Sequence, residues 1–359
     1  MQSCSSFLIF VKVAFLVSVT AFAPLSLRSD KTSRPYYDHT VLDATKRKGA
    51  ANRKKGFGKA TSTSKNPTEK SIYSLPALYD LAFGYRNYEE EVKFLLYAHE
   101  MCTTTTTAAA AAAPQSVLEL AAGPARHSLT ALTLEDTSVK SVTAVDLSPE
   151  MVQYATRLAD ELLGSDNYQR DAFTYLLGDM RTWKTDNKFD TAWILLGSLQ
   201  HMQTNVDVIS CLQSVRNCLI PGGTLILELP HPRETFSMVE CTKNGWEVPL
   251  EDEDGNECGE LKIVWGDETD VFDPIQQVRQ FTVSFELLGT NKLSEDLQSV
   301  KQVVPMRLFT AQEIDALARC SGFEVAAMYG ALSKEVDVND DDEAFRLVCV
   351  LRKTQYERL

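Results

Sequence analysis

The sequence lacks the cysteine spacing of a structural metal site. It has eight cysteines among 359 residues, with no Cys-x-x-Cys pair and none near a histidine in a ligand pattern. Structural zinc needs such grouped ligands, so we expect no metal. The cysteines suit small buried side chains instead. Cys211 and Cys218, seven residues apart, are expected on one face of a helix.

Long apolar runs are also missing. The run Phe7–Val19 is interrupted by Lys12 and is short for a membrane span, but it fits the core of a signal peptide. The small residues of Thr20–Pro24 follow, and after them come Ser, Thr, Lys and Arg with few acids. We therefore predict a signal peptide over 1–24 and a transit-like, disordered segment over 25–70.

The order of these two segments resembles the bipartite presequences of algae with complex plastids. The Ala-Phe-Ala-Pro junction of that motif is present at residues 21–24. The absence of a dense disulfide framework fits a reducing plastid. We therefore predict a plastid protein without stable membrane association once the presequence is removed, with plain secretion as the alternative.

Basic residues are scarce outside this presequence. Residues 1–70 carry 13 Lys and Arg against 4 Asp and Glu, whereas the remainder carries 23 against 45. Phosphate contacts need a basic face, so the acidic body argues against nucleic acid as a partner. The overall composition, 24% charged and 44% hydrophobic, is that of a globular protein.

Strand-like and helix-like runs alternate after residue 115. Two helical pieces are expected within Pro76–His99, and a Thr/Ala linker over Thr103–Ala113. Short apolar strands then follow, separated by helices that include one opening at Ser148 and one over Asn205–Ile220. The five strands are expected at Ser116–Leu120, Lys140–Val145, Thr174–Leu177, Phe189–Leu196 and Thr224–Leu229. Such alternation predicts a parallel sheet covered on both faces.

The alternation stops at about residue 233. Residues 233–308 contain no good helix, and strand-like pieces are expected there at Leu261–Trp265, Val278–Leu288 and Leu297–Val304. We predict an antiparallel insertion. Thr310 and Glu313 then form a capping box that opens a helix to Cys320. Two last strands, Phe323–Tyr329 and Phe345–Leu351, bring the main sheet to seven.

Glycine is scarce where a dinucleotide would need it. Only Gly123 lies between Glu119 and His127, with Ala121 and Ala125 at the flanking turn positions. Three glycines normally let the backbone approach a pyrophosphate. A ligand without phosphates fits better, which disfavours a nicotinamide dehydrogenase.

Acidic residues stand instead at the ends of three strands. Glu119, Asp146 and Asp179 follow the first, second and third strands, and ligands of such sheets bind beyond the carboxyl ends of the strands. Carboxylates can accept hydrogen bonds from an ammonium group, a ribose diol and the amine of a purine. S-adenosylmethionine has all three groups.

With these motifs in order, residues 117–352 resemble the class I S-adenosylmethionine-dependent methyltransferases, of the small-molecule type with a β insertion after the fifth strand. The resemblance implies a Rossmann-like, doubly wound, mostly parallel seven-stranded α/β sheet, within a methyltransferase domain over 71–359. It rests on Glu119–Ala125 as the first motif, on Pro221–Glu228 and on the cap segment Tyr79–Tyr85. It implies these cofactor-binding residues: Tyr79, Glu119, Ala121, Gly123, Arg126, Asp146, Leu147, Met151, Gly178, Asp179, Met180, Leu196 and Gly197.

In this family pattern Asp146 would bind the ribose and residues 178–180 would frame the adenine. Residues 196–198 would flank the methionine half, and Tyr79 would reach its carboxylate. His127 suits either packing or cofactor contact.

The resemblance further implies transfer of a methyl group to an N or O atom of a small-molecule acceptor by in-line displacement. His231 and His201 follow the fifth and fourth strands and are the candidates for a general base, although alignment alone can supply most of the rate. The insertion 233–308 is expected to be a lid that selects the acceptor. The incomplete glycine loop keeps open an alternative, a non-catalytic S-adenosylmethionine-binding regulatory module.

Overall fold

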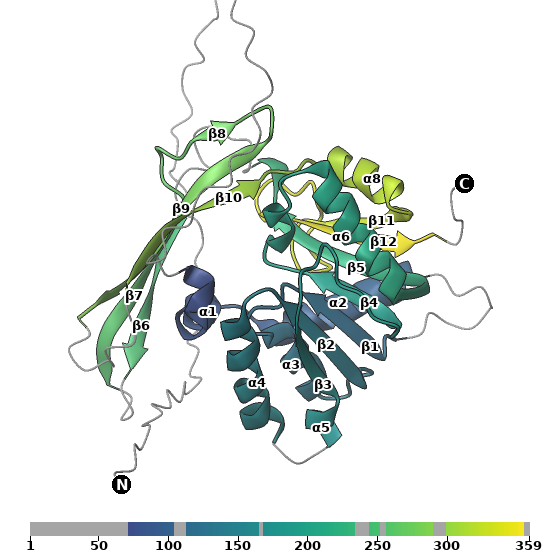
Figure 1. Ribbon diagram of the computed structural model, residues 1–359, viewed down its shortest axis with the longest axis horizontal. Helices are drawn as coiled ribbons and strands as arrows, with labels where there is room; N and C mark the ends of the chain where they lie inside the picture. Colours follow the sequence, from purple (N-terminus) through teal and green to yellow (C-terminus); the bar gives the residue numbers. More distant parts are fainter. Residues whose placement is uncertain are drawn as a thin grey trace, which may run out of the picture. The chain divides into compact units, whose positions relative to one another are not determined.

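A seven-stranded sheet forms the centre of the protein, with helices on both of its faces (Figure 1). The computed structural model describes residues 71–103, 113–164, 168–233, 244–251, 256–289 and 299–354. The predicted presequence 1–70 lies outside these residues, and so does most of the Thr/Ala linker. Among the described residues, no helix is long and apolar enough to span a membrane.

The main sheet has the strand order β11-β12-β5-β4-β1-β2-β3. Strands β1 to β5 pair in parallel, whereas β12 runs antiparallel to both β5 and β11. This confirms the expected mostly parallel, Rossmann-like sheet. The strands are β1 (Ser116–Leu120), β2 (Ser141–Asp146), β3 (Phe173–Leu177), β4 (Phe189–Ile194), β5 (Leu219–Pro230), β11 (Phe323–Tyr329) and β12 (Arg346–Lys353).

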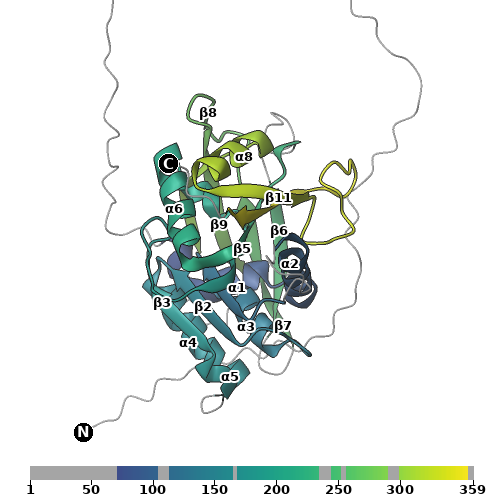
Figure 2. The ribbon, with the colours of Figure 1, turned by 90° about the vertical axis from the view of Figure 1, so that its right-hand side faces the viewer.

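Two groups of helices cover this sheet (Figures 1 and 2). Apolar residues of α6 (Asn205–Cys218) and α8 (Ala311–Cys320) bury one face, and those of α2 (Tyr88–Cys102), α3 (Arg126–Thr133) and α4 (Pro149–Leu163) bury the other. Cys211 and Cys218 both point into the first of these cores, as the spacing predicted. The remaining helices are η1 (Ile72–Ser74), α1 (Pro76–Phe83), the short α5 (Tyr168–Asp171) and η2 (Ser198–His201).

Local sequence signals explain where the helices begin. The Ser148 hydroxyl accepts a hydrogen bond from the Met151 backbone N–H at 3.2 Å, so it caps α4 ahead of Pro149. The Thr310 hydroxyl caps α8 in the same way through Glu313 N–H at 3.1 Å. The Glu313 carboxylate, however, pairs with Arg307, so only half of the expected capping box forms.

The buried face of α4 follows the helical period. Residues four apart lie on the same face of an α-helix, so Leu163 continues the buried row of Ala155 and Ala159, whereas its neighbour Leu162 is 50% exposed.

The insertion forms a second sheet, which is antiparallel and has the order β10-β9-β7-β6, with β8 paired to β9. Its strands are β6 (Asn244–Glu251), β7 (Glu257–Trp265), β8 (Phe272–Asp273), β9 (Val278–Leu288) and β10 (Val300–Arg307). The antiparallel insertion is confirmed, and β6 and β8 are additions that the sequence did not indicate. The predicted start of the last insertion strand, Leu297, lies outside the described residues.

The second sheet packs on the segment that precedes α2. This segment, residues 71–86, contains η1 and α1 and is called the strap below. Strap residues Ile72, Leu78 and Phe83 share one apolar cluster with residues of β7, β9 and β10. The strap therefore lies against the insertion and carries Tyr79 with it.

Candidate functional site

The loop after β1 makes its turn with alanine where glycine is usual. Ala121, Gly123 and Ala125 have φ angles of 53°, 55° and 56°, in the left-handed region that favours glycine. The loop is fixed by Ala122 N–H, which donates to the Val145 carbonyl at 3.1 Å, and by the Tyr175 hydroxyl, which donates to the Gly123 carbonyl. The incomplete glycine motif thus still builds the expected backbone.

Asp146 links this loop to the end of β2. Its carboxylate accepts hydrogen bonds from Gly123 N–H at 2.9 Å and from Ser148 N–H at 2.8 Å. Burial raises the pKa of Asp146, and these backbone donors oppose the rise. The next side chain, Leu147, is 67% exposed, whereas Met151 is fully buried beneath it in α4. Asp146 and Leu147 together offer a carboxylate and an apolar surface at the edge of the sheet where the parallel strands end, called the rim below.

The end of β3 lies directly beside Asp146. Gly178 N–H donates to the Asp146 carbonyl at 2.8 Å, and a Cβ on Gly178 would come within 2.9 Å of Val145. The Asp179 carboxylate accepts from the backbone N–H and the guanidinium of Arg181, which holds its pKa below the ordinary value. Met180 is buried in the core. Residues 146 and 178–180 are therefore brought together, as expected.

Glu119 is buried beside the start of α3. Its carboxylate accepts from the backbone N–H of Ser128 at 3.1 Å and from the Ser128 hydroxyl, both in α3. Burial raises its pKa, and the negative charge of Asp146 adds to the rise. Glu119 therefore holds the start of α3, and its role as a cofactor ligand stays a prediction.

Arg126 anchors the strap. Its guanidinium donates to the Asp80 carboxylate of α1, with Nε 2.8 Å from Oδ1, and the Tyr154 hydroxyl donates to the same carboxylate at 2.7 Å. The sequence placed Arg126 at the cofactor. The structure places it between α3 and the strap, so that it holds the strap and Tyr79 over the loop. An added Cβ on Gly123 would lie 3.9 Å from the Tyr79 ring.

A left-handed turn follows β4. Leu196 and Gly197 have φ angles of 54° and 71°, and a Cβ on Gly197 would lie only 2.7 Å from Gln200, so glycine is required there. Leu196 N–H donates to the Glu228 carboxylate at 2.9 Å. A non-glycine residue held in this region is a strained backbone of the kind found at functional sites.

This turn leads into η2, which ends at His201. The Nε2 of His201 lies 3.1 Å from the hydroxyl of Tyr73, a strap residue. Burial lowers the pKa of His201 and raises that of Tyr73. Tyr73 is also tied to the cofactor side, because the Ser148 hydroxyl donates to its carbonyl at 2.9 Å. Tyr73 was not among the residues predicted from the sequence. The signal that could have indicated it is its position in the same segment, six residues before Tyr79.

His231 is held in a different environment. Its Nε2–H donates to the Val338 carbonyl at 3.0 Å, and its Nδ1 accepts from Arg233 N–H at 3.2 Å. Both ring nitrogens are thus engaged with the backbone. These contacts favour a role for His231 in fixing the loop before β12 over a role as a base.

His127 follows the packing alternative. Its Nε2 lies 2.8 Å from the Glu91 carboxylate of α2, and its ring stacks edge-on against Tyr88 with centroids 5.0 Å apart. The side chain is buried. It therefore joins α3 to α2.

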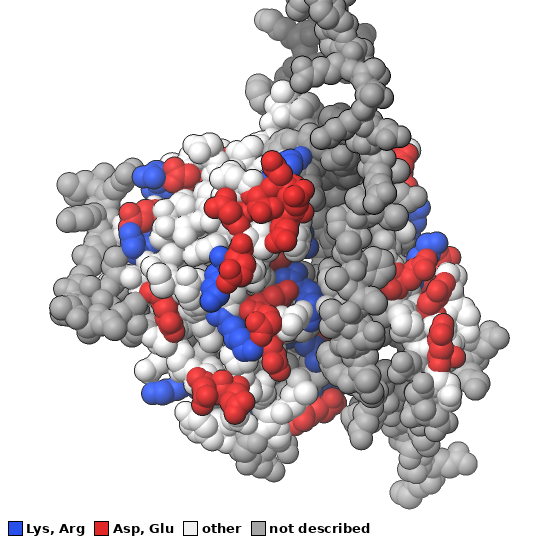
Figure 3. Space-filling view, turned by 180° about the vertical axis from the view of Figure 1, so that it is seen from behind, with Lys and Arg blue, Asp and Glu red and all other residues white. Residues whose placement is uncertain are grey.

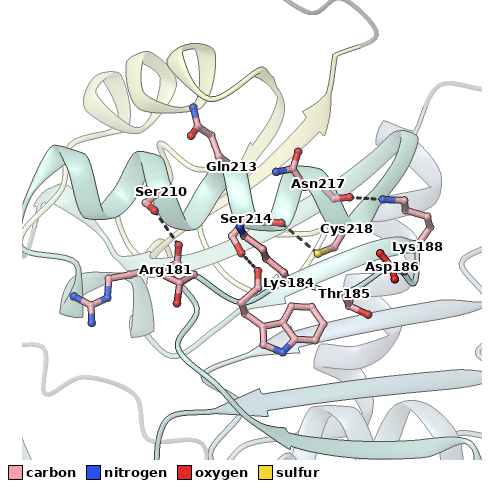
Figure 4. Close-up of a pocket in the computed structure, with 12 residues that line it drawn as sticks. Arg181, Lys184, Thr185, Asp186, Lys188, Ser210, Gln213, Ser214, Asn217 and Cys218 are labelled. Atoms are coloured by element: carbon pink, nitrogen blue, oxygen red, sulfur yellow. Dashed lines mark hydrogen bonds between the residues drawn. The ribbon is translucent and has the colours of Figure 1, made fainter.

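A polar cavity of about 750 Å³ lies on the other side of Asp179, between the loop after β3 and α6 (Figure 4). Parts of its wall are bonded internally, since Lys188 Nζ donates to the Asn217 carbonyl and the Ser210 hydroxyl to the Arg181 carbonyl. None of the predicted site residues lines it. The cavity therefore does not locate the site, which the rim residues above define. Within the described ranges, no three His, Cys, Asp or Glu side chains are grouped to hold a metal ion.

Residues 117–223 match the family model described as a methyltransferase domain. No curated protein matches the sequence. These residues hold the loop after β1, Asp146, residues 178–180 and the turn that leads to His201.

Solved structures show the same fold. An S-adenosylmethionine-dependent methyltransferase from Clostridium acetobutylicum has a TM-score of 0.57 at 16% identity, over 79% of this chain and 99% of its own. An amino pentose methyltransferase from Micromonospora echinaspora, solved with S-adenosylmethionine, has a TM-score of 0.55 at 18% identity, over 79% and 98%. The sugar N-methyltransferase KedS8 from Streptoalloteichus has a TM-score of 0.55 at 15% identity, over 89% and 100%.

The fold is therefore that of S-adenosylmethionine-dependent methyltransferases of known structure, and residues 117–223 match a methyltransferase domain. One of these structures holds S-adenosylmethionine. The side chains fit that molecule, because Asp146 offers acceptors for a ribose diol and Leu147 offers an exposed apolar surface for an adenine ring.

Proposed function

We propose that the protein is an S-adenosylmethionine-dependent methyltransferase that acts on an amine nitrogen of a small polar acceptor such as an amino sugar. Tyr73 and His201 are proposed to remove the acceptor's proton. The observation that carries the proposal is the 3.1 Å contact between the Tyr73 hydroxyl and His201 Nε2. Two proteins with this fold are an amino pentose methyltransferase and a sugar N-methyltransferase. They support an amine acceptor for this chain.

The charge states of the pair suit a proton relay. Burial lowers the pKa of His201, so the imidazole is neutral near pH 7 and can accept a proton. Burial raises the pKa of Tyr73, so its hydroxyl keeps its proton. That hydroxyl can donate to His201 Nε2 while its oxygen lone pairs accept from an acceptor ammonium.

Proton transfer from the acceptor would precede methyl transfer. The acceptor ammonium gives one proton to the Tyr73 oxygen, and Tyr73 passes its own proton to His201. The freed amine lone pair forms a bond to the methyl carbon as the carbon–sulfur bond breaks, and sulfur keeps the bonding electrons. The cofactor supplies a methyl group already activated by the sulfonium. Asp146 is proposed to hold its ribose and Asp179 its adenine amine, which fixes the line of attack.

The test uses S-adenosylmethionine labelled in its methyl group with a panel of amino sugars and the matching sugars that carry a hydroxyl instead. We expect label transfer to the amino members. His201→Asn should lower kcat by roughly 100-fold, and Tyr73→Phe should lower it as well. Binding of S-adenosylhomocysteine, measured by calorimetry, should stay within about threefold of the original.

His231→Gln is the matched control. Because His231 holds backbone groups away from the strap, we expect this variant to lose stability while each folded molecule keeps its kcat. Transfer to the hydroxyl sugars alone, or a loss of kcat confined to His231→Gln, would overturn the proposal.

A further inference from the structure

The strap and the segment 196–201 are joined at two places. The first is the contact between Tyr73 and His201. The second lies at the other end of the strap, where Arg86 Nη2 donates to both oxygens of the Glu228 carboxylate at 3.1 Å. Glu228 in turn accepts from Leu196 N–H at 2.9 Å. The ion pair thus connects the end of the strap to the turn that leads into η2.

The second junction is fully desolvated. The side chains of Arg86 and Glu228 are 5% and 1% exposed. Burial alone would raise the pKa of Glu228. The positive charges of Arg86 and Arg346 outweigh this effect and hold the pKa below its ordinary value, so the carboxylate stays ionised. Arg86 also donates to Glu91 at 3.0 Å. A buried pair of this kind fixes geometry. Arg346 Nε also lies 3.2 Å from the Glu228 carboxylate, so loss of Arg86 would leave Glu228 with one of its two cations.

The geometry explains why this junction matters for the first one. Leu196 sits in the left-handed region, where a non-glycine residue persists only if its surroundings hold it. Glu228 does so through two contacts, because its carbonyl also accepts from Gly197 N–H at 3.0 Å. The helix η2 begins at the next residue, Ser198, so a rotation at residues 196–197 would carry His201 with it.

We propose that Arg86 and Glu228 are positioning residues, whose buried ion pair holds Tyr73 of the strap against His201. Neither touches the reacting atoms. The inference rests on the proposed role of Tyr73 and His201 and adds a requirement to it: the strap and the turn after β4 must be locked together by charge before the relay is aligned.

The titration of His201, followed by NMR of its ring in the complex with S-adenosylhomocysteine, tests this without an acceptor. Tyr73 of η1 contacts His201. The strands packed against η2 carry Glu228 on β5 and Arg307 on β10, which are paired with Arg86 and Glu313. In Arg86→Met the strap is released, water enters, and the pKa of His201 should rise toward that of an ordinary histidine. Arg86→Lys should restore part of the original value.

Arg352→Met is the matched control, because it makes the same change to an arginine of β12 that pairs with Glu324 at 2.8 Å. We expect it to leave the titration of His201 unchanged. If Arg86→Met does not fold, the double variant Arg86→Met with Glu228→Leu removes the buried carboxylate that has lost one of its two cations and should show the same rise.

The outcomes separate the two proposals. An unchanged His201 titration in the folded Arg86 variants, or an equal rise in Arg352→Met, overturns the positioning role. A rise in the Arg86 variants supports it even if His201→Asn keeps full activity, and in that case the proposed relay fails instead. Once an acceptor is in hand, Arg86→Met should lower kcat with S-adenosylhomocysteine affinity held within about threefold.

Discussion

The loop after β1 carries conformational strain, because two of its alanines adopt the left-handed conformation. Ala121 and Ala125 both have φ near 55°, which costs an L-residue with a Cβ about 1–2 kcal/mol. The two positions differ in burial, because Ala125 is fully buried and Ala121 is only partly so. The effect of glycine should therefore differ between them.

We expect Ala121→Gly to raise the free energy of unfolding by about 0.5–1 kcal/mol, since strain relief exceeds the added freedom of glycine in the unfolded chain. Ala125→Gly should be close to neutral, because it also gives up a buried methyl group worth about 0.8 kcal/mol. Urea unfolding of both variants measures the difference. A larger gain at residue 125 than at residue 121 would contradict this account.

At the scale of elements, the sequence predicted what depends on local periodicity. β1 and β11 begin and end where the apolar runs do, and Ser148 marks the start of α4. It did not indicate β6, whose strand character comes from eight paired residues of β7 rather than from its own pattern. Tertiary pairing of this kind leaves no local trace.

The residues of the candidate site also fall into two groups, those that the local pattern predicted and those that contacts distant in sequence determine. The strand ends placed Asp146 and Asp179 on one rim because parallel strands end at one edge. The directions of Glu119, Arg126 and His231 depend on partners distant in sequence, namely Ser128, Asp80 and Val338. The Arg86–Glu228 pair spans 142 residues and was invisible for the same reason.

The packing of the insertion on the strap revises the expected division of labour between acceptor and cofactor binding. Trp246 Nε1 of β6 donates to the Ala82 carbonyl at 2.7 Å, and its ring packs against Phe83 with centroids 5.7 Å apart. Phe83 packs in turn on Tyr79 at 4.7 Å. The insertion therefore supports the part of the strap proposed to cover the cofactor.

We expect Trp246→Ala to weaken S-adenosylhomocysteine binding by about tenfold, or about 1.4 kcal/mol, through loss of this support for the strap. Calorimetry measures it. Lys262→Ala on β7, which is paired only loosely with Glu247 at 4.0 Å, serves as the control on the same sheet. Unchanged binding in Trp246→Ala would restore the view that the insertion serves the acceptor alone.

At the scale of the whole molecule, the body is acidic. Figure 3 shows several groups of Asp and Glu side chains on the face seen from behind, in keeping with 45 acidic against 23 basic residues after residue 70. Such a field attracts cations. An amine acceptor and the sulfonium cofactor are both positively charged, so the charge of the body agrees with the proposed substrates.

Stability of the whole domain should depend on one buried histidine. His99 of α2 is 2% exposed, and its Nδ1 lies 2.8 Å from the Thr224 hydroxyl in β5, an interior strand of the main sheet.

Burial lowers the pKa of His99 to about 4, whereas the unfolded chain titrates near 6.5. Between these values the unfolded state binds a proton that the folded state refuses, so stability is full above about pH 6.5 and falls as the pH drops. The difference reaches about 3 kcal/mol below pH 4 and about 2 kcal/mol at pH 5. Urea unfolding at pH 7 and pH 5 measures it, with His99→Gln as the variant that should lose this part of the pH dependence. An equal fall in stability in His99→Gln would contradict this account.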